Sequence, residues 1–148
     1  MTVLEKVKNA EKQFKDNTEE VKAEIKQFFK EKFDSPAFEN YIEEICSWAI
    51  KEGKTQVEIL AEFWQYTPGC SNTYFSFGRF RWSNPNTDWQ GQRVYKGVDL
   101  KVIHQDLINE IVQLGQKKLT EMGFVIHDTQ IEYNSFKEMK MRTFFGWC

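Results

Sequence analysis

The sequence lacks long apolar runs, closely spaced cysteines and an excess of charge of either sign. A membrane-spanning helix needs about 20 apolar residues, and the apolar stretches here are only a few residues long, so we expect no transmembrane segment. The 20 basic and 22 acidic side chains give a formal net charge of -2, which excludes a polybasic nucleic-acid arm. Any electrostatic function must therefore be local.

The cysteine and histidine content argues against metal, disulfide and cofactor chemistry. Three cysteines form no close pair, which is typical of a reducing compartment and gives no disulfide framework. The two histidines, His104 and His127, lie far from any cysteine at ligand spacing, so we expect no metal site and no cofactor. The chain opens with alternating Lys and Glu and has no signal-peptide pattern, so we expect a cytoplasmic protein.

The length of 148 residues predicts a single domain over residues 1–148. Lysine outnumbers arginine by 16 to 4, phenylalanine is abundant and alanine is scarce, which suggests a low-GC bacterium or one of its phages. The unusual number is the aromatic content. The 13 Phe, 5 Trp and 5 Tyr exceed what a core of this size needs, so we expect some rings to face a partner.

Residues 1–66 read as a helical part of about four helices, because apolar residues recur at spacings of three and four. Asn17 is a candidate helix cap, and Ser35 followed by Pro36 is a typical helix start. A capping box from Thr55 to Glu58 predicts a fourth, short helix before Pro68. The apolar stripes of these helices are Val3, Val7, Ala10 and Phe14; Val21, Ile25, Phe28, Phe29 and Phe33; Phe38, Tyr41, Ile42, Ile45 and Ala49; and Leu60, Phe63 and Trp64.

We expect residues 70–148 to form two strands, then one helix, then two further strands. Alternating rings and polar groups over 72–82, turn residues over 83–88 and a return strand over 89–96 predict a β-hairpin. Asp99 is placed to cap a long helix that ends near Gly123, and residues 124–147 predict a second hairpin around Asn134. The simplest arrangement is a four-stranded antiparallel sheet with the long helix on one face, so the fold class is α+β.

The first hairpin is the main candidate for a binding surface. Three of the four arginines, Arg79, Arg81 and Arg93, lie within it among seven aromatic rings. On a continuous strand over 73–82, Phe75, Phe77, Arg79 and Arg81 would share one face. Arginine beside aromatic rings suits a protein interface, suits base stacking and phosphate contact, and also suits rings that simply fill the core. The residues expected to contact a partner or ligand are Phe75, Phe77, Arg79, Arg81, Trp82, Trp89, Arg93, Tyr95, Lys140 and Arg142.

A second basic patch is expected on the last strand, where Lys137, Lys140 and Arg142 alternate with methionines. If both hairpins share one sheet, its outer face could be continuously basic, although any half-exposed strand alternates in this way. The first two helices could bind a partner helix, form a homodimer or cover the sheet.

The sequence favours a small non-catalytic binding protein that acts through its Arg and aromatic-rich hairpin, with a protein as partner and no membrane. The most concrete version is a phage or mobile-element inhibitor of a host defence protein. The alternative is a nucleic-acid or nucleotide-binding protein that uses the same surface. A third hypothesis, an enzyme centred on Cys70, has no local hydrolase motif to support it.

Overall fold

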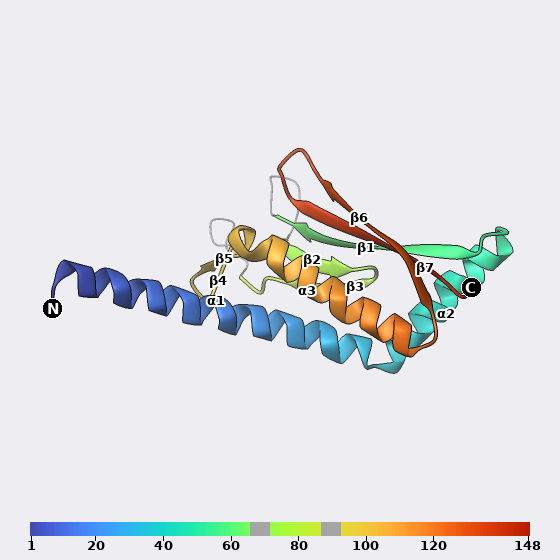
Figure 1. The fold of residues 1–148 in the computed structure, drawn as a ribbon, viewed down its shortest axis with the longest axis horizontal. Helices are drawn as coiled ribbons and strands as arrows, with labels where there is room; N and C mark the ends of the chain where they lie inside the picture. The colour runs from blue at the N-terminus through green and yellow to red at the C-terminus, as the bar shows by residue number, and fades with distance from the viewer. Residues whose placement is uncertain (66–71, 87–92) are drawn as a thin grey trace.

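The computed structural model describes residues 1–65, 72–86 and 93–148, which form three helices, a five-stranded antiparallel sheet and a small two-stranded sheet. The fold is therefore α+β, as the sequence predicted, although the described residues have three helices rather than about four (Figure 1). The elements are α1 (Val3–Phe33), α2 (Pro36–Lys51), β1 (Gln56–Trp64), β2 (Tyr74–Phe77), β3 (Phe80–Ser83), β4 (Val94–Tyr95), β5 (Val98–Asp99), α3 (Leu100–Glu121), β6 (Val125–Tyr133) and β7 (Met139–Gly146). None of the helices in these residues is both long and apolar enough to cross a membrane.

Helix α1 is a single helix, and the prediction of two helices separated at Asn17 is wrong. Its start is fixed by a capping box in which Thr2 and Glu5 each accept a hydrogen bond from the other's backbone N–H. The side chain of Asn17 accepts a hydrogen bond from Gln13 Nε2 at 3.0 Å on the helix surface, so it is not used as a cap. The predicted break before Pro36 is confirmed, because α2 begins there.

The segment from Gln56 to Trp64 is a strand, so the prediction of a fourth helix is wrong. Ile59, Ala61 and Phe63 are buried at every second residue, which is the period of a strand packed on one face. Strand β1 pairs with β7 over 56–62 and with β2 over 61–64, and it lies at the centre of the sheet order β3-β2-β1-β7-β6. The β2–β3 and β6–β7 hairpins therefore share one sheet with β1 between them, and this sheet has five strands rather than the predicted four.

The first hairpin differs from the prediction, because the segment expected as its first strand, residues 72–82, folds back on itself instead of pairing with residues 89–96. Strands β2 and β3 are joined directly by Gly78 and Arg79, with Phe75 opposite Trp82 and Phe77 opposite Phe80. The turn requires the positive φ of +59° at Gly78, where a Cβ would also lie 2.3 Å from the hydroxyl of Tyr41. The predicted return strand over 89–96 lies partly outside the described residues, and its described part contains β4, which pairs with β5 in the separate two-stranded sheet.

The C-terminal helix and hairpin follow the prediction closely. The Asp99 side chain accepts a hydrogen bond from the backbone N–H of Lys101 and caps α3. Gly123 has a φ of +98°, as a helix C-terminus favours, and β6 pairs with β7 across the loop at 134–138.

Helices α1 and α3 pack on one face of the sheet, called the inner face below, while α2 lies beside the first half of β1. Aromatic rings make up much of the core between them. Phe33 of α1, for example, lies 5.1 Å from Phe38 and 5.0 Å from Phe77, ring centre to ring centre. The largest fully buried side chains include Phe29, Phe38, Phe63, Phe75, Phe77 and Phe145.

Candidate functional site

Three of the rings expected to contact a partner lie in the core. Phe75, Phe77 and Trp82 are all buried. The physical reason is the turn at Gly78 and Arg79, which folds the segment back on itself and places the rings of both short strands on the inner face. Phe75 and Phe77 therefore lie on the opposite face of the sheet from Arg81, and not on the same face as predicted for a continuous strand. Trp89 and Cys70 lie outside the described residues.

The arginines of the first hairpin are exposed but already engaged within the chain. Arg79 forms an ion pair with Glu44 at 2.8 Å, and Arg93 forms one with Asp99 at 3.0 Å. The guanidinium of Arg81 stacks 3.8 Å from the ring centre of Tyr74, opposite the inner face. Tyr95 donates a hydrogen bond to Glu24 at 2.7 Å, which ties the β4–β5 hairpin to α1.

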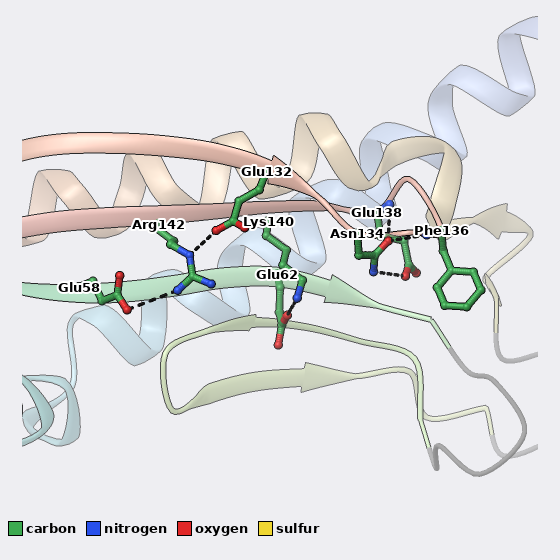
Figure 2. A network of polar contacts seen from close by, with 8 residues as sticks. All are labelled: Glu58, Glu62, Glu132, Asn134, Phe136, Glu138, Lys140 and Arg142. Carbon is green, nitrogen blue, oxygen red and sulfur yellow. Dashed lines mark hydrogen bonds and ion pairs between the residues drawn. The ribbon is translucent and has the colours of Figure 1, made fainter.

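The sheet face opposite the helices, called the outer face below, is electrically mixed (Figure 2). Arg142 binds Glu132 of β6 and Glu58 of β1, and the hydrogen bond to Glu132 raises the pKa of Arg142. Lys140 lies 3.6 Å from Glu62 of β1. A continuous basic face is therefore not formed, because β1, expected as a helix, inserts two glutamates beside the basic residues of β7.

A cleft of about 640 Å³ lies between α2 and the start of β1, a volume within the usual range of ligand pockets. We call it the α2–β1 groove. Helix α2 contributes one wall, the turn after it closes one end, and β1 contributes the other wall together with Phe144 of β7. Its lining residues are Ile45, Trp48, Ala49, Glu52, Gly53, Lys54, Thr55, Gln56, Val57, Glu58 and Phe144.

The groove lies where a strand of the sheet is missing. Strand β1 pairs with β7 from Gln56 onward, but β2 begins to pair with β1 only at Ala61. Within the described residues, the edge of β1 over 56–60 therefore has a strand on one side only. Helix α2 lies beyond this open edge, and the groove lies at it.

The backbone groups of the open edge can be assigned from the hydrogen-bond pattern. The C=O of Leu60 accepts a hydrogen bond from the N–H of Gly78, so Leu60 directs its backbone groups away from β7. In an antiparallel strand this direction alternates, so Glu58 and Gln56 direct their N–H and C=O the same way. Four backbone groups are thus aimed along the open edge and are ready to pair with an extended chain.

The side chains of the groove combine an apolar wall with paired charges. Trp48, Ile45 and Val57 all line the groove, and Trp48 is 65% exposed whereas the other two are half-buried. At the end of the groove, Lys54 and Glu52 form an ion pair at 2.8 Å, and the hydrogen bond to Glu52 raises the pKa of Lys54. Glu58, the third charged lining residue, is paired with Arg142 at 3.4 Å, so each charge that lines the groove has a partner and the apolar wall is left to receive a large apolar side chain.

The described residues offer little for catalysis. No group of three or more His, Cys, Asp or Glu in residues 1–65, 72–86 and 93–148 is arranged to hold a metal ion. The Cys46 thiol is buried, and burial raises its pKa, which disfavours the reactive thiolate. Both ring nitrogens of His104 bond to backbone groups, at Lys101 O and Met139 N, so this histidine has a structural position.

The sequence reasoning missed the groove residues. The one available signal was Trp48, which lies at the flank of the apolar stripe of α2 rather than at its centre.

Comparison of the chain with protein-family models, with curated proteins and with solved structures gave no match.

Proposed function

We propose that this chain is a non-catalytic protein-binding module that takes an extended segment of a partner protein into the α2–β1 groove. The segment would add to the sheet as a strand beside Gln56 and Glu58, with a large apolar side chain against Trp48. The observation that carries the proposal is the open edge of β1, which, among the residues that the structure describes, faces a groove instead of a neighbouring strand.

Strand addition supplies affinity and specificity from different groups. The N–H and C=O of Gln56 and Glu58 offer four main-chain hydrogen bonds, each with a net value of about 0.5–1.5 kcal/mol. The apolar wall of Trp48, Ile45 and Phe144 would select the side chain that points into the groove. Exposed tryptophans of this kind are enriched among the residues that dominate protein interfaces.

The basic residues support a protein partner rather than a nucleic acid. Arg79, Arg93 and Arg142 each have a carboxylate partner, so binding of a phosphate would require breaking an ion pair or bringing an anion beside an acid. The proposal keeps the function expected from the sequence, a non-catalytic binding protein. It places the partner-binding surface in the α2–β1 groove instead of on the first hairpin. Inhibition of a host defence protein by a phage remains a prediction.

The first test uses peptides selected from a random library displayed on phage, with the full chain as bait. Bound peptide should slow hydrogen exchange at the amides of Gln56 and Glu58. Amides of β1 that bond to β7, such as that of Ile59, are already protected and serve as internal controls. Selected peptides that leave both groove amides unchanged would contradict strand addition.

Two substitutions at Glu58 separate its backbone from its side chain. Glu58→Ala and Glu58→Pro both remove the carboxylate and its ion pair, but only proline removes the N–H on the open edge. That N–H is not part of the ladder with β7, so the fold should tolerate proline as edge strands do. We expect Glu58→Ala to bind the selected peptide and Glu58→Pro to lose it, with matching circular dichroism spectra.

A second pair of variants tests the apolar wall. Trp48 and Ile50 are similarly exposed on α2, at 65% and 59%, but only Trp48 lines the groove. Trp48→Ala should weaken peptide binding about 30-fold, corresponding to about 2 kcal/mol, whereas Ile50→Ala should leave it unchanged. Equal effects of the two variants would refute the groove as the binding surface.

A further inference from the structure

Strand β6 is an edge of the five-stranded sheet, and among the described residues no strand pairs with its outer side (Figure 1). The N–H of Asn134 donates a hydrogen bond to the C=O of Glu138, so Asn134 directs its backbone groups toward β7. This direction alternates along an antiparallel strand, so Ile131 and Tyr133 direct their N–H and C=O away from β7. These groups are aimed at the open side of the edge, where another strand can pair with them.

The stretch of β6 that can receive a strand has a defined end. Thr129 also directs its backbone groups outward, but its N–H donates to the side chain of Asp128 at 2.8 Å. Beyond it, a β-bulge between Ile126 and Asp128 interrupts the pairing with β7. The usable stretch therefore runs from Thr129 to Tyr133 with Ile131 at its centre, and we call it the β6 edge.

The β6 edge is apolar on the inner face of the sheet. Ile131 and Tyr133 lie opposite Met141 and Met139 of β7, which are buried, and residues opposite each other share a face. Ile131 and Tyr133 are nevertheless 55% and 56% exposed. Proteins usually protect an edge strand with charged residues or proline, and the inner face of the β6 edge carries neither.

Helix α3 crosses the sheet obliquely, which explains why this part of β6 is uncovered. Near the hairpin loop, His104 accepts a hydrogen bond from the N–H of Met139 and lies 5.1 Å from Phe63, ring centre to ring centre, so α3 lies over β7 and β1 there. Toward its other end, Gln116 donates a hydrogen bond to the hydroxyl of Thr129 on β6. The helix therefore covers β6 at Thr129 and leaves it open at Tyr133.

The side of α3 that faces β6 carries no charged residue. Six residues recur there at steps of three and four, which places them on one side of the helix, and the hydrogen bond of Gln116 to Thr129 shows that this side faces β6. We call these residues the uncharged strip of α3; they are Val102, Gln105, Asn109, Gln113, Gln116 and Thr120. Depletion of charge is typical of the core of a protein interface.

We infer that the β6 edge pairs antiparallel with the β6 edge of a second copy of this chain, so that the two sheets become one. With Ile131 of the two copies opposite each other, Tyr133 of each copy lies opposite Thr129 of the other. One patch thus serves both copies, as a symmetric dimer requires. The dimer does not depend on the proposed groove, because the groove lies at the edge of β1, on the other side of β7.

This register pairs the outward backbone groups of both copies. The N–H of Ile131 donates to the C=O of Ile131 of the second copy, and the N–H of Tyr133 donates to the C=O of Thr129; symmetry forms each bond twice. The N–H of Thr129 exchanges the carboxylate of Asp128 for the C=O of Tyr133 of the second copy. Asp128 therefore competes with the second copy for one donor.

The charges of the outer face select this register. It places Gln130 opposite Glu132 of the second copy, and Gln130 is itself opposite Arg142 on β7, so a base, an amide and an acid follow one another across the junction. With Glu132 on the two-fold axis instead, its two copies would face each other. With Gln130 on the axis, Asp128 would face Glu132 twice. Like charges directly opposite each other destabilise a strand pair, so both neighbouring registers are disfavoured.

The oblique path of α3 fits the same arrangement. Each copy covers Thr129 with Gln116 and leaves Tyr133 open, and the register sets Tyr133 of one copy beside Thr129 of the other. The ring of Tyr133 then lies against the uncharged strip of α3 of the second copy, and the two Ile131 side chains meet at the axis. The most exposed apolar residues of the β6 edge are buried together.

The first test is sedimentation velocity of the full chain over a range of concentrations. We expect a concentration-dependent species with twice the 17.7 kDa mass of the chain. Ile131→Lys and Val125→Lys each place one positive charge on an exposed apolar residue of β6, but only Ile131 lies in the β6 edge, and Val125 is 47% exposed. Ile131→Lys should abolish the dimer and Val125→Lys should keep it, with unchanged thermal unfolding at low concentration. A chain that is monomeric at every concentration, or a dimer that survives Ile131→Lys, would overturn the inference.

Hydrogen exchange of the unaltered chain locates the interface without a substitution. The amides of Ile131 and Tyr133 should exchange more slowly as the concentration rises, because they become bonded in the dimer. The amides of Gln130 and Glu132 bond to β7 in both states and serve as internal controls. A dimer that leaves the exchange of Ile131 and Tyr133 unchanged would place the contact elsewhere and refute the pairing of β6, whatever the outcome of peptide binding at the groove.

Substitution of Asp128 gives a test with the opposite sign. Asp128→Ala frees the N–H of Thr129, so it should tighten the dimer. Asp128→Asn removes the same charge but keeps a side-chain oxygen that can accept this N–H, so it should tighten the dimer less. The dissociation constants come from the same sedimentation experiments, and a weaker dimer in Asp128→Ala than in Asp128→Asn would contradict the proposed register.

Discussion

Gly115 of α3 gives the sharpest test of how the first hairpin is packed. A Cβ at this position would lie 2.6 Å from Cζ and 2.7 Å from Cε2 of Phe77. Phe77 is fully buried and packs against Phe33, so its ring has little room to move. The glycine therefore allows α3 to approach β2 closely.

Gly115→Ala should raise the free energy of unfolding if residue 115 faces solvent and lower it if residue 115 packs against Phe77. In a solvent-facing helix the change stabilises by about 1 kcal/mol, because alanine has the higher helix propensity. Overpacking of a core costs about 1–3 kcal/mol, and two contacts below 3.0 Å place this site toward the upper end. We expect the free energy of unfolding to fall by about 1–2 kcal/mol, the overpacking cost less the gain in propensity.

Urea unfolding followed by tryptophan fluorescence measures this free energy. The control is the same substitution in a Phe77→Leu background, because leucine lacks the ring atoms that the new methyl group would meet. There Gly115→Ala should be neutral or stabilising, so the two changes should show a favourable coupling energy. Stabilisation by Gly115→Ala in the unaltered chain would refute the packing of Phe77 beneath α3.

Three further predictions concern the core, a helix cap and a pH-dependent contact. Phe63→Ala should lower the free energy of unfolding by about 3–5 kcal/mol in the same urea assay, because Phe63 is fully buried at the centre of the sheet. Asp99→Ala should cost about 1 kcal/mol through loss of the α3 cap, whereas Asp99→Asn should retain most of it, as measured by thermal unfolding. The hydrogen bond from Tyr95 holds the pKa of Glu24 below its ordinary 4.5, against the opposing effect of burial, so its contribution is present above that pH and lost as the pH falls. The difference in unfolding free energy between the unaltered chain and Glu24→Gln should therefore be below about 1 kcal/mol at neutral pH and disappear in acid.

Local signals were sufficient where the structure is decided by local chemistry. Asp99 and Gly123 mark the two ends of α3, because a side-chain cap and a positive φ act within a few residues. Strands β6 and β7 are joined by a short loop and were equally clear. Asn17 misled because an asparagine can cap a helix or bond to Gln13 on its surface, and the choice depends on the helix on either side.

Strand β1 could not be assigned locally because its sequence fits two periods. Leu60 and Phe63 have helical spacing, and the capping box at Thr55 supports that interpretation. Ile59, Ala61 and Phe63 have the spacing of a strand. The decision comes from β7, which pairs with β1 from some eighty residues further along the chain.

The candidate site follows from that same non-local pairing, and this is why no motif announces it. A binding edge appears on β1 because β2 reaches only as far as Ala61 while β7 continues to Gln56. The length of β2 is in turn limited by the turn at Gly78, whose close approach to Tyr41 fixes where the hairpin ends beside α2. Extending the hairpin by two residue pairs would cover the C=O of Glu58 and fill part of the groove. The groove is thus a consequence of one short hairpin meeting one long strand, a relation between segments that neither segment shows by itself.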